Sequence, residues 1–149
     1  MAVVKAEGYG HGAGQVARAS IDAGATTLGV ATAAEAVELR EAGLACPIVI
    51  LGPLTGAEAQ TAIDCGAEIL LWTQAFLKTL VPLQFDKDRR LGVHVNLDSC
   101  MHRLWFFPLP LPDLLNLLTP PPTVPLVSVL TPFAHPVSDS HHFPNYASP

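Results

Sequence analysis

Short apolar segments alternate with capped helical segments through the first hundred residues, and this alternation constrains the fold more than any other feature. Strands are expected at residues 3–5, 27–31, 47–51, 68–72 and 91–97. Between them, T-A-A-E at Thr32 and T-G-A-E at Thr55 are capping-box patterns, in which a threonine and a glutamate satisfy the free N–H groups at the start of a helix. The alternation predicts parallel strands joined by right-handed crossovers.

Each expected helix ends at or just before a glycine or a proline, the residues that commonly terminate helices. They are residues 13–23 before Gly24, a helix from Thr32 to Gly43, one from Thr55 to Gly66, and residues 74–80 before Pro82. Two architectures fit this pattern, an open doubly wound sheet and a closed (β/α)₈ barrel, and the periodicity does not separate them.

The composition excludes several classes of protein. The chain has 149 residues, about one domain, and 50% of them are hydrophobic, so it can build a core. A formal net charge of −5 argues against a nucleic-acid surface, and no apolar run is long enough for a membrane span. Three widely spaced cysteines form neither a zinc pattern nor a disulfide framework, which suits a reducing cytosol, and no metal site or signal peptide is expected.

The segment V-V-K-A-E-G-Y-G-H-G, from Val3 to Gly12, is the main candidate for chemistry. A lysine near the end of a buried strand loses hydration, which favours the neutral amine that can form a Schiff base with an aldehyde. The glycines permit positive φ and the close approach of a ligand. From spacing alone, a structural interpretation is favoured, in which Lys5 extends out of an edge strand and the glycines only make a turn.

Three segments together resemble the alanine racemases. A-V-V-K-A-E-G-Y-G-H-G is similar to the family's cofactor-lysine segment, close to A-V-V-K-A-(N/D)-A-Y-G-H-G, and G-V-A-T-A-A-E-A-V-E-L-R-E-A-G and P-I-V-I-L-G-P match in order and spacing. The resemblance implies an α/β fold, a partial (β/α)₈ TIM-type barrel with about six parallel strands and intervening helices. It implies pyridoxal 5'-phosphate as cofactor, Lys5 as the catalytic Schiff-base lysine, and Tyr9 beside the cofactor.

A fourth segment, H-V-N-L-D-S-C-M-H-R-L-W-F from His94, resembles the family's H-(L/V)-(K/N)-(V/L)-D-T-G-M-G-R-L-G-F. The resemblance implies that Arg103 binds the cofactor and the substrate carboxylate, and that Met101 lies near the substrate. A guanidinium suits this role because it stays charged and offers fork-like donors. Asn96 stands where many members have a lysine.

The later part of the chain departs from the family. Cys100, His102 and Trp105 replace small residues, and Pro132 stands where the family has a histidine against the cofactor ring. Most prolines lie after Phe106, and no lysine or arginine follows Arg103. We therefore expect residues 1–106 to be an incomplete alanine racemase N-terminal barrel, and residues 107–149 a proline-rich divergent tail with a sixth strand near 124–131.

The function that the resemblance implies is racemisation of L- and D-alanine, which supplies D-alanine for peptidoglycan, by a cytoplasmic homodimer. A full barrel needs about 250 residues and eight strands, so this chain is expected to be an incomplete or inactive fragment. Two alternatives stay open: a non-catalytic pyridoxal-phosphate-binding barrel, and a remnant that binds no ligand.

Overall fold

The computed structural model shows an α/β fold with one parallel sheet of six strands, as the alternation predicts. It describes residues 1–80, 82–83, 91–96, 112 and 126–130. The strands are β1 (Ala2–Val3), β2 (Leu28–Val30), β3 (Ile48–Ile50), β4 (Glu68–Leu71), β5 (Val93–Asn96) and β6 (Leu126–Leu130). They lie in chain order, every neighbouring pair is parallel, and β1 and β6 stand at the two edges of this sheet.

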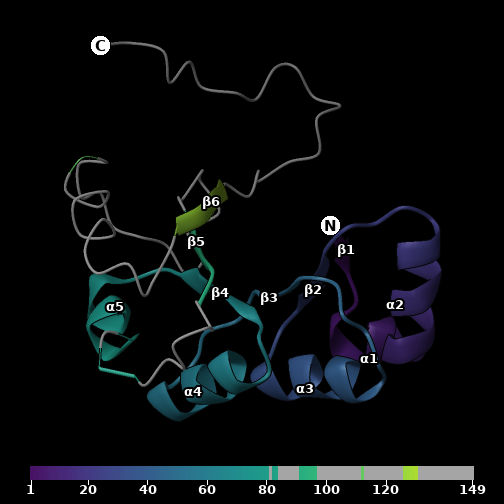
Figure 1. The fold of residues 1–149 in the computed structure, drawn as a ribbon, viewed down its shortest axis with the longest axis horizontal. Helices are drawn as coiled ribbons and strands as arrows, with labels where there is room; N and C mark the ends of the chain where they lie inside the picture. Colours follow the sequence, from purple (N-terminus) through teal and green to yellow (C-terminus); the bar gives the residue numbers. More distant parts are fainter. Residues whose placement is uncertain (81, 84–90, 97–111, 113–125, 131–149) are drawn as a thin grey trace.

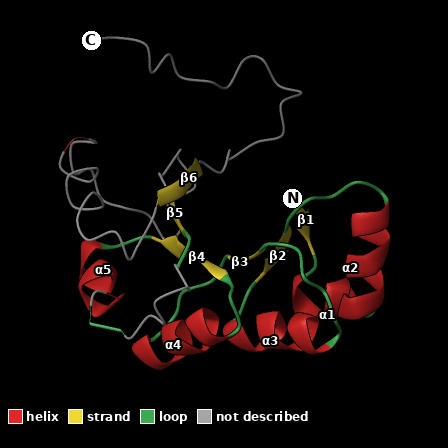
Figure 2. Ribbon diagram, in the orientation of Figure 1, coloured by secondary structure: helices red, strands yellow, loops and turns green. Residues whose placement is uncertain are grey.

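The described helices lie on one side of the sheet (Figure 1). They are α1 (Lys5–Gly10), α2 (Ala13–Asp22), α3 (Ala33–Glu41), α4 (Gly56–Asp64) and α5 (Gln74–Leu80). Figure 2 shows the alternation of strand and helix along the chain. The four longer helices match the expected ranges, whereas α1 was expected to be a glycine-rich turn. None of the helices in the described ranges is long and apolar enough to cross a lipid bilayer.

The core lies between the sheet and these helices. The strand side chains that face the helices are fully buried: Leu28, Val30, Ile48, Ile50, Ile69, Leu71, Val93 and Val95. The helices meet them partly through buried alanines, namely Ala17, Ala36, Ala59 and Ala62, whose small side chains let a helix approach the sheet closely. On β4 burial alternates, because Ile69 and Leu71 are buried while Glu68 and Leu70 are only partly buried. The helices therefore cover one face of the sheet.

Both predicted capping boxes are present. The Thr32 hydroxyl accepts a hydrogen bond from the Glu35 amide at 3.2 Å, and the Glu35 carboxylate accepts one from the Thr32 amide at 3.1 Å. Thr55 and Glu58 form the same pair of bonds, at 3.3 and 2.8 Å. Because a capping box depends only on residues three apart, the sequence pattern alone identifies it.

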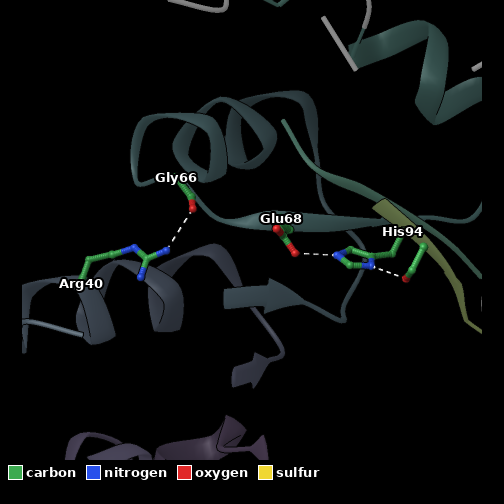
Figure 3. A network of polar contacts seen from close by, with 5 residues as sticks. Arg40, Gly66, Glu68 and His94 are labelled. Atoms are coloured by element: carbon green, nitrogen blue, oxygen red, sulfur yellow. Dashed lines mark hydrogen bonds and ion pairs between the residues drawn. The ribbon is translucent and has the colours of Figure 1, made fainter. Parts of the chain in front are cut away.

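Arg40, near the end of α3, ties two segments of the fold together, and Figure 3 shows its bond to one of them at Gly66. Its Nε donates to the Cys65 carbonyl at 2.9 Å and its Nη2 to the Gly66 carbonyl at 3.0 Å, both just after α4. Its Nη1 donates to the carbonyls of Leu44 and Cys46, both at 2.7 Å, in the segment that leads into β3. One guanidinium thus caps α4 and fixes the entry to β3.

Gly52, the second residue after β3, marks a close approach of two strand ends. A β-carbon at this position would overlap the carbonyl oxygen of Ala31, which directly follows β2. A backbone carbonyl cannot give way as a flexible side chain can. The carboxyl-terminal ends of β2 and β3 therefore require glycine here.

Candidate functional site

The segment that carries Lys5 is a single left-handed helical turn at the carboxyl end of β1. Residues 6–9 have φ between 51° and 60° and ψ between 38° and 54°. Three of these four residues are not glycine, namely Ala6, Glu7 and Tyr9. The left-handed helical region costs a non-glycine residue roughly 1–2 kcal/mol. A run of such residues persists only where its surroundings hold it, and strain of this kind gathers at functional sites.

Hydrogen bonds from several sides hold this turn. Within it, the Gly8 amide donates to the Val4 carbonyl, and the Gly12 amide to the Glu7 carbonyl, both at 2.9 Å. The Glu7 carboxylate also accepts from the Ala13 amide at 3.3 Å, at the start of α2. From α3, the Glu35 carboxylate accepts from the Ala6 amide at 2.8 Å. The turn is therefore anchored to two helices.

The glycines take the positive φ that the sequence predicts. Gly8, Gly10 and Gly12 have φ of 60°, 83° and 90°. A β-carbon at Gly8 would lie 3.0 Å from a side-chain methyl of Val16, so this part of the turn is packed against α2. Apart from its chain neighbours and the backbone of its own helix, no heavy atom of the described residues lies within 4 Å of a β-carbon built at Gly10. The turn is thus packed on one side and open beside Gly10.

Lys5 and Tyr9 lie at the two ends of this turn. Lys5 is half-buried and Tyr9 is 59% exposed. The prediction that Lys5 ends a buried strand is wrong in detail: β1 stops at Val3, Val4 is buried, and Lys5 begins the left-handed turn. The backbone already leaves the extended region at Val4, with φ of −123° and ψ of 20°, and positive φ begins at Ala6. A reachable amine, an exposed phenol and open space over Gly10 fit an aromatic aldehyde cofactor bound to Lys5.

The other predicted site residues lie outside the described residues. These are Arg103 and Met101, together with the replacements Cys100, His102, Trp105 and Pro132. Asn96 is the last residue of β5. The roles of Arg103 and Met101 therefore stay predictions.

A polar network on the sheet was not foreseen from the sequence. His94 on β5 is only 6% exposed, and its Nε2 lies 2.7 Å from a carboxylate oxygen of Glu68 on β4. Its Nδ1 lies 2.7 Å from the hydroxyl oxygen of Ser128 on β6 (Figure 3). Because an ionised carboxylate only accepts, Nε2 carries the hydrogen, and in the neutral ring Nδ1 accepts from Ser128. The network joins three neighbouring strands.

Side chains alternate between the two faces of β5, so the sequence predicts that His94 faces away from the helices. Which residues His94 contacts depends on the register of the strands beside β5. The pairing shifts between Val93 and His94, so that Val93 pairs with Leu126 and His94 with Ser128. Such an irregularity turns a side chain toward a new neighbour.

Within the described residues, no three histidine, cysteine or acidic side chains gather as a metal site.

Comparison with known proteins agrees with this fold. The family described as "Alanine racemase, N-terminal domain" matches residues 1–147. The alanine racemase of Desulforamulus reducens is 41% identical over 108 residues, covering 72% of this chain and 29% of that protein. The alanine racemase of a Nostoc strain is 47% identical over 109 residues, with coverages of 70% and 28%. The chain thus spans less than a third of these relatives.

Solved structures of alanine racemases also match this chain. The alanine racemase from E. faecalis superposes with a TM-score of 0.81 at 34% identity, covering 88% of this chain and 36% of that one. The alanine racemase from Bacillus anthracis with bound L-Ala-P gives 0.79 at 34% identity, with coverages of 89% and 34%. From the family match over residues 1–147 and the fold shared with solved alanine racemases, this chain belongs to the alanine racemase N-terminal domain family.

Proposed function

We propose that this chain supplies the cofactor-lysine part of a pyridoxal-phosphate-dependent alanine racemase, with Lys5 as the lysine. The observation that carries the proposal is the left-handed turn, which leaves Lys5 and Tyr9 reachable at the carboxyl end of β1. In barrels of this kind, functional groups lie at the carboxyl ends of the strands. The chain spans less than a third of its relatives, so the proposal assigns it a share of the site.

In this proposal, four residues contact the cofactor or the substrate: Lys5, Tyr9, Arg103 and Met101. Lys5 would hold the cofactor through its Nζ, and the same Nζ would hold or move a proton as one of two acid–base groups. Tyr9 lies beside the cofactor. Arg103 binds a cofactor oxygen and the substrate carboxylate, and Met101 lies near the substrate. When bound, pyridoxal phosphate supplies an electron sink for the charge that develops at the substrate carbon.

The wider setting follows from the family and belongs to the same proposal. We infer that the substrate is alanine, that the product serves D-alanine supply for the cell wall, and that the working enzyme is a cytoplasmic homodimer. The names of the relatives support the substrate. The location and the dimer rest on the family resemblance.

The test is to label the lysine. The 149-residue chain is incubated with pyridoxal phosphate, its Schiff-base absorbance is recorded, and the adduct is reduced with borohydride and located by peptide mapping. We expect the label on Lys5 and its loss in Lys5→Ala, whereas Lys78→Ala, which removes an exposed lysine of α5, keeps it. Label spread evenly over the three lysines of the chain, Lys5, Lys78 and Lys87, would refute the proposal.

D-alanine formation separates the catalytic function from simple cofactor binding. A chain that binds pyridoxal phosphate at Lys5 and supports no turnover when assembled with the remaining parts of a racemase would be a non-catalytic binding barrel. A chain that forms no adduct at any of its lysines and shows no pyridoxal phosphate binding would be a remnant that binds no ligand. Turnover that depends on Lys5 would support the racemase function.

A further inference from the structure

The Glu35 carboxylate accepts two more hydrogen bonds than a capping box needs, from the amides of Ala31 and Ala6. One of its carboxylate oxygens, Oε2, accepts from the amides of Ala31 at 2.6 Å and Thr32 at 3.1 Å, at the junction of β2 and α3. The other, Oε1, accepts from the amide of Ala6 at 2.8 Å, 29 positions away in the sequence. Ala6 is the first residue of the left-handed run and the neighbour of Lys5.

The chain contains an internal comparison for this bond. Glu58 occupies the same place in the capping box of α4, and α3 and α4 have the same length of 9 residues. Among the described residues, the Glu58 carboxylate accepts hydrogen bonds from Thr55 alone, from the Thr55 amide and the Thr55 hydroxyl. The bond from Glu35 to Ala6 is therefore additional to helix capping, and it joins α3 to the turn that carries Lys5.

We propose that Glu35 is a positioning residue that holds the turn after Lys5 in its left-handed conformation. This proposal rests on the proposed function of Lys5. The carboxylate gives the Ala6 amide a charged acceptor, which strengthens the bond. It is itself held by two further amides, so its oxygen stays in place. Without this acceptor, the strained run would spend more time in other conformations, and the apparent affinity for a ligand at Lys5 would fall by the same fraction.

The experiment compares Glu35→Gln with two controls in the 149-residue chain. Thr32→Ala weakens the same capping box without removing the acceptor of the Ala6 amide, and Glu58→Gln changes the equivalent glutamate of α4. Folding of each variant is checked by circular dichroism. If Glu35→Gln does not fold, Glu35→Asp takes its place, because it keeps the charge but is one methylene shorter.

Two readouts are used. The first is amide hydrogen exchange of residues 5–12 without cofactor, which reports local opening of the turn. Glu35→Gln leaves the Ala6 amide at most a neutral acceptor, so we expect it to speed this exchange about 10-fold, as loss of the charge from this bond implies, with neither control doing so. The second is the pyridoxal phosphate concentration that gives half of the Schiff-base absorbance, which should rise about 10- to 100-fold in Glu35→Gln only.

Each outcome decides the proposal. Unchanged exchange in Glu35→Gln, or an equal change in the two controls, would overturn it. Faster exchange with unchanged cofactor affinity would also overturn it, because the turn would then not matter to Lys5. If the wild-type chain forms no Schiff base, the proposed function of Lys5 fails, and the exchange data alone decide whether Glu35 holds the turn.

Discussion

Replacing Arg40 by alanine should destabilise the fold by about 3 kcal/mol. Its guanidinium makes four hydrogen bonds to carbonyl oxygens, of which three are partly buried and one, to Gly66, is exposed. A net contribution of about 1 kcal/mol for each of the three partly buried bonds gives this estimate. The exposed carbonyl can bind water instead. Arg40→Lys keeps the charge but loses the planar fork, and should cost roughly 2 kcal/mol.

The assay is urea unfolding followed by circular dichroism, with the slope m compared between variants so that a change in midpoint reports a change in stability. In thermal unfolding, a loss of about 3 kcal/mol corresponds to a fall in Tm of roughly 6–12 °C for a chain of this size. Arg18→Ala, at an exposed position of α2, is the control and should stay within about 0.5 kcal/mol of wild type. An Arg40→Ala variant as stable as the Arg18→Ala control would refute the reasoning.

Three further variants follow from the geometry. Gly52→Ala should cost about 2–3 kcal/mol in urea unfolding, because the new β-carbon would overlap the carbonyl of Ala31. His94→Ala should cost about 1–3 kcal/mol in the same assay, because it leaves its polar partners on two strands without their bonds. Hydrogen bonds from the amide and then the hydroxyl of Thr55 lower the pKa of the Glu58 carboxyl below its usual 4.5. The ionised Glu58 carboxylate therefore stabilises the fold above about pH 4.5, and this stabilisation is lost as the pH falls through the lower pKa of the folded state. Glu58→Gln lacks this carboxylate, so it should lose less stability on acidification than wild type.

These three predictions have their own controls. Gly14→Ala lies within a helix where the added β-carbon makes only an ordinary contact of 3.7 Å, and it should not destabilise the chain. Equal stability of Gly52→Ala and Gly14→Ala would contradict the first prediction. A His94→Ala midpoint equal to wild type would contradict the second. Parallel stability curves for wild type and Glu58→Gln between about pH 6 and about pH 3 would contradict the third.

The elements that could be predicted from the sequence are those set by local contacts. The Thr32 and Thr55 capping boxes connect residues three apart, and the apolar strand at 47–51 needs no partner to be recognised. Gly24 and Gly66 take the positive φ expected after a helix. For this reason the order of strands and helices agrees closely with the structure.

The candidate site was only partly predictable, because it depends on contacts between distant residues. Positive φ is expected of glycine, so nothing in the sequence indicates that Ala6, Glu7 and Tyr9 take it as well. The bond from Glu35 to Ala6 crosses 29 positions, and the partners of His94 depend on a register shift. The predicted role of Lys5 rests on resemblance to a family, because spacing alone favours a structural role.

The strand order has a consequence for how this chain folds as it is synthesised. Each of β2 to β6 pairs with the strand made just before it, so no pairing has to wait for a distant segment and each loop that must close is short. The sheet can grow from its first strands while the rest of the chain is still on the ribosome. Chains arrested after α4 should then already protect β2 and β3 from protease, whereas full unfolding of such arrested chains would rule out this sequential growth.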